Sequence, residues 1–449
     1  MSQPLDVPAL VETLAPRVED LLRRARARGA SAAQASIGIE RGLSATVRLG
    51  EVETLEYHHD RGLTLTVYCG HAKGTASTTD LSPEALEAAL EAALAIARHT
   101  DEDPCAGLPD PQHLAREIPD LDLHHPWGLE AAEAVALAKR CEDAARAADP
   151  RIRNSEGATL STHEGLHLYA NTHGFLGHYP TSRHSLSCAV IAEDESGMQR
   201  DYWYDVNRVP QALAAPEAIG EEAAARAVAR LGARPLPTRE VPVVFAAEVA
   251  AGLLRHYTSA VRGANLYRRT SFLVDSLGRQ VFPEWLEMRE EPHLPRALAS
   301  APFDSEGVAT RTRTVVERGR VAGYFLNSYA ACRLGMETTG NAGGIHNLIV
   351  TTGPLDRDGL LREMGTGLLV TELMGQGVNL VTGDYSRGAA GFWVENGEVQ
   401  HPVEEVTVAG NLKDMFAAIE AVGADVDTRR AIRTGSICIG RMTVAGRPG

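Results

Sequence analysis

Positive charge is scarce in this chain of 449 residues. Against 59 Asp and Glu there are only 44 Lys and Arg, which gives a formal net charge of −15. Such a surface repels phosphate backbones, and no run of Lys or Arg is long enough to reverse the charge locally. The composition therefore argues against direct nucleic-acid binding, while the length is sufficient for two or three domains with their own cores.

Cysteine is also sparse. The six cysteines are scattered without paired spacing: Cys69, Cys105, Cys141, Cys188, Cys332 and Cys438. A disulfide framework or a Cys-based zinc knuckle would cluster them, so we expect free thiols in a reducing cytoplasm.

Long apolar runs and a secretory signal are lacking too. The stretch from Leu86 to Ala97 is interrupted by Glu87 and Glu91 and is too short to span a bilayer, so it predicts an amphipathic helix. The first residues, Met1 to Asp6, contain no basic region followed by an apolar block. We expect a cytoplasmic chain without a membrane segment.

What the sequence does contain is a regular change of pattern. Helical spacing or helix-start residues mark four segments: 8–28, the segment opened by Ser82, 129–147 and 217–231. Between them, residues 35–69 and 152–204 alternate in short runs typical of antiparallel strands. The order helix, strands, helix thus occurs twice before residue 235, which hints at related modules without residue-level similarity.

Two irregular stretches divide the chain. Residues 101–126 lack a period and predict a long linking loop, and Arg234-Pro235-Leu236-Pro237 predicts a boundary before a region of short strands and Gly-rich turns. We therefore predict an α+β fold, with mixed N-terminal modules built on antiparallel sheets and a β-rich C-terminal domain. The expected parts are an N-terminal α+β module (1–125), a second strand-rich module with flanking helices (126–235) and the C-terminal domain (236–449).

A literal H-E-x-x-H occurs at His163-Glu164-Gly165-Leu166-His167. On a helix this spacing places two imidazoles one turn apart, where they bind zinc while Glu activates water. Here the flanking residues favour a strand or turn, and Gly165 sits in the middle. Because residues four apart on a strand lie roughly 13 Å apart, two such histidines cannot share one zinc ion. We therefore expect a surface hairpin.

Three further histidines, His173, His178 and His184, bring the number to five within 22 residues. A metal site assembled across strands is conceivable, because neighbouring strands lie only about 5 Å apart. No Asp or Cys is interleaved at ligand-like spacing, however, so we favour a polar sheet face or an interface.

A strand-to-helix junction at residues 243–256 can present side chains into a cleft. Glu248 is the only acid in the first turn of this expected helix, and it could equally interact only with the positive helix N-terminus. His256 is two turns further on and displaced around the axis, so it forms no zinc pair with Glu248. We name Glu248 and His346 as the candidate catalytic residues.

Other familiar site motifs are missing. The Gly-rich segment 340–347 lacks the Lys and Ser/Thr of a phosphate-binding loop, no dinucleotide fingerprint follows a strand, and no G-x-S-x-G is present. Its glycines, like those of 383–391, fit the close backbone approach of a neighbouring chain or peptide.

Several long blocks resemble the TldD/PmbA metallopeptidase family, in its PmbA (TldE) branch. The blocks comprise residues 102–109, 182–187, 271–278, 302–307, 343–347, 363–377 and 383–397, among them Gly383-Asp384-Tyr385-Ser386-Arg387-Gly388. The similarity covers nearly the whole chain.

This resemblance implies a cytosolic relative of TldD, with which PmbA-type chains form a heterodimeric peptidase that processes small or unfolded peptides. The family is also labelled a modulator of DNA gyrase. The TldD arm holds zinc through H-E-x-x-x-H on a helix and a C-terminal cysteine. At the equivalent helix this chain has Ala247 and Gly252 in place of the histidines, only Glu248 remains, and Cys438 is not aligned to the zinc-binding cysteine. The resemblance therefore implies no cofactor in this chain and zinc in a TldD-like partner.

Three functional hypotheses follow. The first is a non-metal subunit of a zinc-peptidase complex that forms one wall of a peptide-binding chamber. The second is a self-contained peptidase that uses the 163–184 histidines or a site around Glu248 and His346. The third is a homodimer that binds peptides without cutting them.

Overall fold

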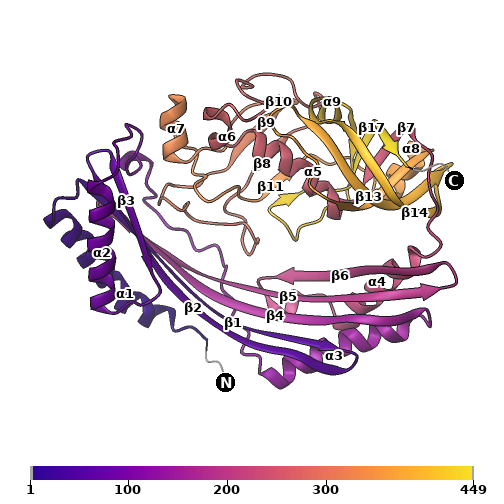
Figure 1. The fold of residues 1–449 in the computed structure, drawn as a ribbon, viewed down its shortest axis with the longest axis horizontal. Helices are drawn as coiled ribbons and strands as arrows, with labels where there is room; N and C mark the ends of the chain where they lie inside the picture. Colours follow the sequence, from indigo (N-terminus) through magenta and orange to yellow (C-terminus); the bar gives the residue numbers. More distant parts are fainter. Residues whose placement is uncertain (1–3, 447–449) are drawn as a thin grey trace.

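The computed structural model describes residues 4–446, so residues 1–3 of the N-terminal segment discussed above lie outside it. Figure 1 shows two layers: a long curved sheet with helices on its outer face, and a C-terminal strand-rich domain over the opposite face. The predicted α+β class is confirmed, as is the β-rich character of the C-terminal half.

Two units of the same order build the curved sheet. The first comprises α1 (Val7–Ala27), β1 (Ala32–Arg48), β2 (Glu51–Cys69), β3 (Ala72–Thr78) and α2 (Pro83–Arg98). The second comprises α3 (Ala131–Ala148), β4 (Ile152–Asn171), β5 (Leu176–Asp194), β6 (Gly197–Asn207) and α4 (Pro216–Ala229). The strand order is β3-β2-β1-β4-β5-β6, antiparallel throughout and symmetric about the β1–β4 pair. One sheet therefore runs across the expected boundary at residues 125 and 126.

The two faces of this sheet differ in polarity. In β1, Ala33, Ala35, Ile37 and Ile39 are buried against the helices, while the residues between them point the other way. Burial of each large aliphatic side chain contributes about 1.5–3 kcal/mol, so the period-2 pattern fixes which face receives the helices. The remaining face is polar and lies toward the C-terminal domain.

Glycine permits close packing under the sheet. A Cβ on Gly74 of β3 would lie 2.0 Å from the carbonyl oxygen of Ala93 and 2.5 Å from the amide nitrogen of Ala97, both in α2. In the second unit, a Cβ on Gly220 of α4 would lie 2.1 Å from the carbonyl oxygen of Cys141 in α3. In both units, then, the backbones meet at a distance that only Gly allows.

Residues 101–126 form the expected linking loop, with a single 3-10 turn, η1 (Pro111–His113). The expectation of six free thiols is wrong for two of them: Cys105 in this loop is disulfide-bonded to Cys332 of α7 (Ser328–Leu334). The two lie 227 residues apart in sequence, and the packing of the C-terminal domain on the loop brings their Cα atoms to 5.5 Å. Spacing along the chain could not reveal this pairing. The four other cysteines are free.

The C-terminal domain contains a closed barrel. β7 (Arg239–Phe245), β12 (Gly367–Met374), β13 (Asp384–Glu395), β14 (Glu398–Asn411) and β17 (Ile437–Ala445) form a ring because β14 pairs with β17, and β15 (Ile419–Val422) adds to β17. A second sheet has the order β10-β9-β8-β11-β16. Its strands are β8 (Met288–Glu290), β9 (Arg313–Glu317), β10 (Arg320–Val321), β11 (Leu348–Val350) and β16 (Ile432–Arg433). The remaining helices are α5 (Ala247–Ala260), α6 (Gly263–Tyr267), α8 (Arg357–Met364) and α9 (Leu412–Ala417).

Across residues 4–446 no helix is long and apolar enough to cross a membrane. The stretch from Leu86 to Ala97 lies in α2, where Leu86, Leu90 and Leu94 are buried against the sheet.

Substitution of two strand glycines should separate packing from backbone propensity. Gly74→Ala places a methyl group against the α2 backbone, so we expect a loss of about 1–3 kcal/mol in the free energy of unfolding. Gly38 of β1 is the matched control, because a Cβ there meets no atom within 4 Å. Gly38→Ala should be neutral or slightly stabilising. Urea unfolding of both variants tests this, and equal effects would contradict the packing argument.

Candidate functional site

Helix α5 occupies the strand-to-helix junction that the sequence predicts, directly after β7, and Figure 1 places it on the side of the C-terminal domain that faces the curved sheet. The start of the helix has no local cap, because the N-cap residue is Ala246. The Ala247 N–H instead donates to Ser436 Oγ (3.1 Å), and this hydroxyl donates to Asp425 Oδ2 (2.6 Å). A segment almost 190 residues further along the chain therefore fixes the helix start.

Glu248 is engaged by a cation. Arg226 Nη1 of α4 lies 2.9 Å from Glu248 Oε1, and Arg226 Nε lies 3.3 Å from Asp201 Oδ1 of β6. Arg230 extends the network to Asp201 (3.6 Å) and to Glu372 of β12 (2.5 Å). The side chains of Arg226 and Glu248 each retain 16% exposure, and that of Asp201 retains 6%. The charges are thus largely desolvated and hold the curved sheet to the C-terminal domain.

A cavity of about 240 Å³ lies at this network, and we call it the Glu248 cavity. Its lining comprises Asp201, Tyr202, Trp203, Tyr204, Arg226, Glu248, Val249, Gly252, Thr371, Glu372, Leu373, Arg387 and Arg430. The guanidinium groups of Arg226 and Arg429 lie 4.9 and 4.4 Å from the centre of the Trp203 ring. These cation–π contacts hold the arginines in place beside the carboxylates.

The residues at this cavity do not fit a zinc ion. Ala247 and Gly252 offer no lone pair, and the Glu248 carboxylate already contacts a cation. Cys438 of β17 packs among apolar side chains, and burial, with the nearby Glu420 and Glu363, raises the pKa of its thiol to about 12. A thiol in this state is a poor source of the thiolate that zinc requires. No group of three or more His, Cys, Asp or Glu side chains within residues 4–446 is arranged to hold a metal.

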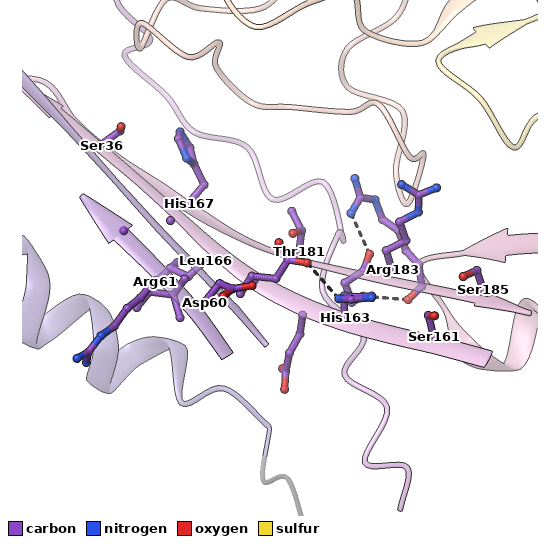
Figure 2. Close-up of a pocket in the computed structure, with 18 of the residues that line it drawn as sticks. Ser36, Asp60, Arg61, Ser161, His163, Leu166, His167, Thr181, Arg183 and Ser185 are labelled. Carbon is purple, nitrogen blue, oxygen red and sulfur yellow. Dashed lines mark hydrogen bonds and ion pairs between the residues drawn. The ribbon is translucent and has the colours of Figure 1, made fainter. Parts of the chain in front are cut away.

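The H-E-x-x-H motif lies inside β4, which pairs with β1 on one side and β5 on the other, so of the strand or turn expected from its flanks the strand is confirmed. Figure 2 shows His163 and His167 well apart along the strand. His163 Nδ1 lies 3.1 Å from Glu40 Oε1, and its ring stacks on His58. His167 packs against Tyr179 and Phe303, and burial lowers its pKa. The two imidazoles therefore contact different partners.

The three other histidines of this region are also separate. His184 of β5 is buried between Thr162 Oγ1 (2.8 Å) and the carbonyl of His125 (2.9 Å). His173 lies in the β4–β5 turn with Nδ1 at 3.1 Å from the Pro109 carbonyl, and His178 lies on β5 opposite Leu168. The contacts of His163, His173 and His184 are thus structural.

The polar face of the sheet is hollowed by a groove of about 860 Å³. Gly38, Gly62 and Gly165 line it on adjacent strands, and the missing side chains create the depression. Polar side chains surround it, among them Ser36, Asp60, Ser161, His163, Thr181 and Arg183 (Figure 2). Sequence reasoning predicted a polar face here but not a groove, since its lining comes from several strands. The only signal was glycine within strand-like segments.

His346 lies elsewhere. Its backbone N–H donates to Glu290 Oε1 (2.8 Å) and its Nδ1 lies 3.3 Å from the same atom. Glu290 is buried and also accepts from Arg313 (2.8 Å) and Asn341 (2.7 Å). Neither the Glu248 cavity nor the sheet groove is lined by His346, so the structure does not bring the two candidate residues to one cavity.

Family models and relatives match along the whole fold. Residues 33–97, 124–231 and 238–446 match domain 1, the central domain and the C-terminal domain of the PmbA/TldA metallopeptidases. The chain is 50% identical over 415 residues to metalloprotease PmbA of Escherichia coli O157:H7, which covers 92% of each chain. The chain belongs to the PmbA/TldD metallopeptidase family.

Further comparisons agree with this membership. A PmbA homologue of Haemophilus influenzae is 50% identical over 421 residues, 93% of each chain. A crystal structure from Bacteroides thetaiotaomicron, described as a candidate modulator of DNA gyrase, superposes with a TM-score of 0.91 at 27% identity and covers 96% of this chain and 99% of its own.

The Arg226 network should be important for the stability of this PmbA/TldD-family chain. Arg226→Met leaves Glu248 and Asp201 without their main cation in a largely buried site, so we expect a loss of roughly 3 kcal/mol in the free energy of unfolding. Arg140 is the matched control, because its ion pair with Glu217 joins α3 and α4 at the surface. Arg140→Met should cost far less, because solvent screens an exposed ion pair. Equal small losses in urea unfolding would contradict the assigned role.

His256 of α5 should make stability depend on pH. Burial and the charges of Arg387 and Arg255 lower its pKa to about 4. Because free His titrates near 6.5, the unfolded chain takes up a proton that the folded chain does not as the pH falls from about 6.5 to about 4. His256 therefore reduces the free energy of unfolding over that window. His256→Gln should flatten this part of the wild-type pH profile, while His99→Gln at an exposed position should not. An unchanged profile in His256→Gln would contradict the assignment.

Proposed function

We propose that this chain is the non-metal subunit of a cytosolic TldD/PmbA-type peptidase complex that processes small or unfolded peptides. In this proposal a TldD-like partner holds the zinc and performs the cleavage. The main support is the ion pair between Arg226 and Glu248. A glutamate that activates a zinc-bound water needs a metal beside it, and here a guanidinium contacts that carboxylate while Ala247 and Gly252 supply no ligand.

The curved sheet supports a peptide-binding role. The groove on its polar face carries hydroxyl, carboxylate and guanidinium groups, and its glycines allow a peptide backbone to approach closely. In addition, β3 pairs only with Leu63–Cys69 of β2, so residues 51–62 of β2 pair on one side with β1 alone. A free strand edge of this kind can bind an extended chain through main-chain hydrogen bonds, which tolerates many sequences and selects unfolded segments.

The test is metal content and peptidase activity with and without a TldD-like chain. Alone, the purified protein should carry far less than one zinc per chain and leave an unfolded test peptide intact. After mixing with the partner, size-exclusion chromatography with light scattering should give a one-to-one complex that cleaves the peptide. Arg226→Met should bind no zinc either, because it frees two carboxylates but adds no imidazole or thiolate to complete a zinc site.

Other outcomes would assign other functions. Stoichiometric zinc with cleavage by the isolated chain would contradict the proposal and support a self-contained peptidase, especially if His163→Ala and His167→Ala abolished both. A stable homodimer that binds peptide but neither joins the partner nor supports its cleavage would support a peptide-binding protein without catalysis.

A further inference from the structure

The opposite end of α5 borders a second cavity of about 290 Å³, which we call the Arg255 cavity. It lies between the C-terminal half of α5, β16 and the segment 341–345. Its charged lining residues are Arg255, Arg262 and Arg430, and no Asp or Glu lines it. In a chain with a net charge of −15, three guanidinium groups around one small cavity are a local reversal of charge.

Little of this positive charge is paired with a carboxylate within the fold. Within residues 4–446 no carboxylate lies within 4.0 Å of the side-chain nitrogens of Arg255 or Arg262, and neither side chain donates a hydrogen bond. Arg430 lies 3.7 Å from Asp427, a carboxylate that Arg429 already contacts at 2.9 Å, and the Nε of Arg430 is buried without a hydrogen-bond partner. Arg255 and Arg262 are exposed, so water satisfies their donors and their charge stays available to a ligand. The buried Nε of Arg430 differs, because buried donors are normally satisfied, and this nitrogen indicates a missing acceptor.

The same positive charge affects a neighbouring histidine, His256. His256 follows Arg255 directly on α5, and after burial itself the charges of Arg387 and Arg255 are the causes that lower its pKa. Among the described residues Arg387 has no carboxylate partner either, and it lines the adjoining Glu248 cavity. An anion placed beside α5 would relieve this uncompensated charge.

Both cavities lie along one face of α5. Glu248, Gly252, Arg255, Ser259 and Arg262 follow one another at intervals of four, three, four and three residues, which places them on one side of the helix axis and its continuation. Arg430 lines both cavities. A single extended ligand can therefore reach the Arg255 cavity with its end while its body follows the helix toward Glu248.

The rest of the lining indicates what that end carries. The polar part of the wall comprises the arginines, the hydroxyls of Thr258 and Ser259, and the amide of Asn341. The remaining wall is mainly apolar and includes Ile345 and Ile432. Inorganic phosphate would leave this apolar wall uncovered. A carboxylate attached to an apolar side chain would satisfy both parts, since Arg binds carboxylates through two parallel N–H donors and apolar walls hold hydrocarbon.

We propose that the Arg255 cavity binds the C-terminal carboxylate of a peptide whose last residue is apolar. The inference rests on the proposed function, namely that this chain forms part of a peptide-binding chamber. It adds that substrates are held by their free C-terminus, in a fixed register along α5. Internal segments of a folded protein would lack this anchor.

The test is equilibrium binding of two fluorescently labelled pentapeptides to the full-length chain. Both have the same unstructured sequence and end in Leu, one as the free acid and one as the amide. The free acid should bind at least tenfold more tightly, and the preference should weaken as ionic strength rises. In the double variant Arg255→Gln, Arg262→Gln the two peptides should bind equally. Arg279→Gln is the matched control, because Arg279 is exposed in the same domain, its side chain has no partner in the part of the chain that the structure describes, and it lines neither cavity.

Competition distinguishes the sources of a bound anion. N-acetyl-leucine should displace the free-acid peptide at a lower concentration than N-acetyl-leucinamide or inorganic phosphate. Displacement by phosphate at the lowest concentration would overturn the inference and assign a phosphate site. Equal binding of acid and amide, a preference that survives in the double variant, or no binding of either peptide would also overturn it. Metal content and partner-dependent cleavage decide the proposed function separately, so each can fail while the other stands.

Discussion

The ion pair between Arg226 and Glu248 joins two parts of the molecule that the chain builds separately. Arg226 belongs to a helix packed on the curved sheet, and Glu248 belongs to the helix that follows the first barrel strand. Because both side chains are largely desolvated, neither can lose its partner without leaving a charge in a poor solvent. The same contact fixes the position of α5 over the sheet and places a cation beside the remaining glutamate. Domain arrangement and site chemistry thus depend on one interaction.

In that arrangement the C-terminal domain covers one part of the polar face of the sheet and leaves another part accessible. Phe303 of the C-terminal domain packs against His167, Phe175 and Tyr179, and with Tyr169 it forms a small apolar cluster between the layers. The Cys105–Cys332 disulfide links the same two layers through the connecting loop. The groove of the sheet therefore has a rigid floor and fixed walls, which reduces the conformational cost of binding a flexible chain.

How much of this could be predicted depends on the range of the interactions involved. The helices were visible because buried residues such as Leu14, Val18 and Leu21 repeat at helical spacing. Strand lengths are underestimated, because the sequence predicts short runs over residues 35–69, whereas β1 and β2 continue through Gly42 and Gly62 and pair across the sheet. Glycine there serves the groove and the close contacts of neighbouring strands, which a local pattern does not distinguish from a turn.

The candidate site shows the same limit more sharply. That Ala247 and Gly252 offer no side-chain donor to a metal is a property of the residue types, and it is read directly from the sequence. The sequence does not show which cation pairs with Glu248. The chain contains many arginines, and only the packing of α4 against β6 places Arg226 beside this carboxylate. His346 is a candidate because imidazole can act in catalysis. In the structure, the buried Glu290 beside it accepts hydrogen bonds from three residues and makes that imidazole part of a structural network.

The charges along α5 are consistent with a helix that binds without cutting. At its first turn, a carboxylate that could activate water is neutralised by Arg226. Further along the same face, Arg255 and Arg262 have no counter-charge among residues 4–446. A helix that takes part in catalysis presents its charged groups at the reacting bond. A helix that only positions a ligand presents them where the end of that ligand binds. The unpaired charge of this helix lies away from Glu248, so its electrostatics favour orienting a chain over activating a nucleophile.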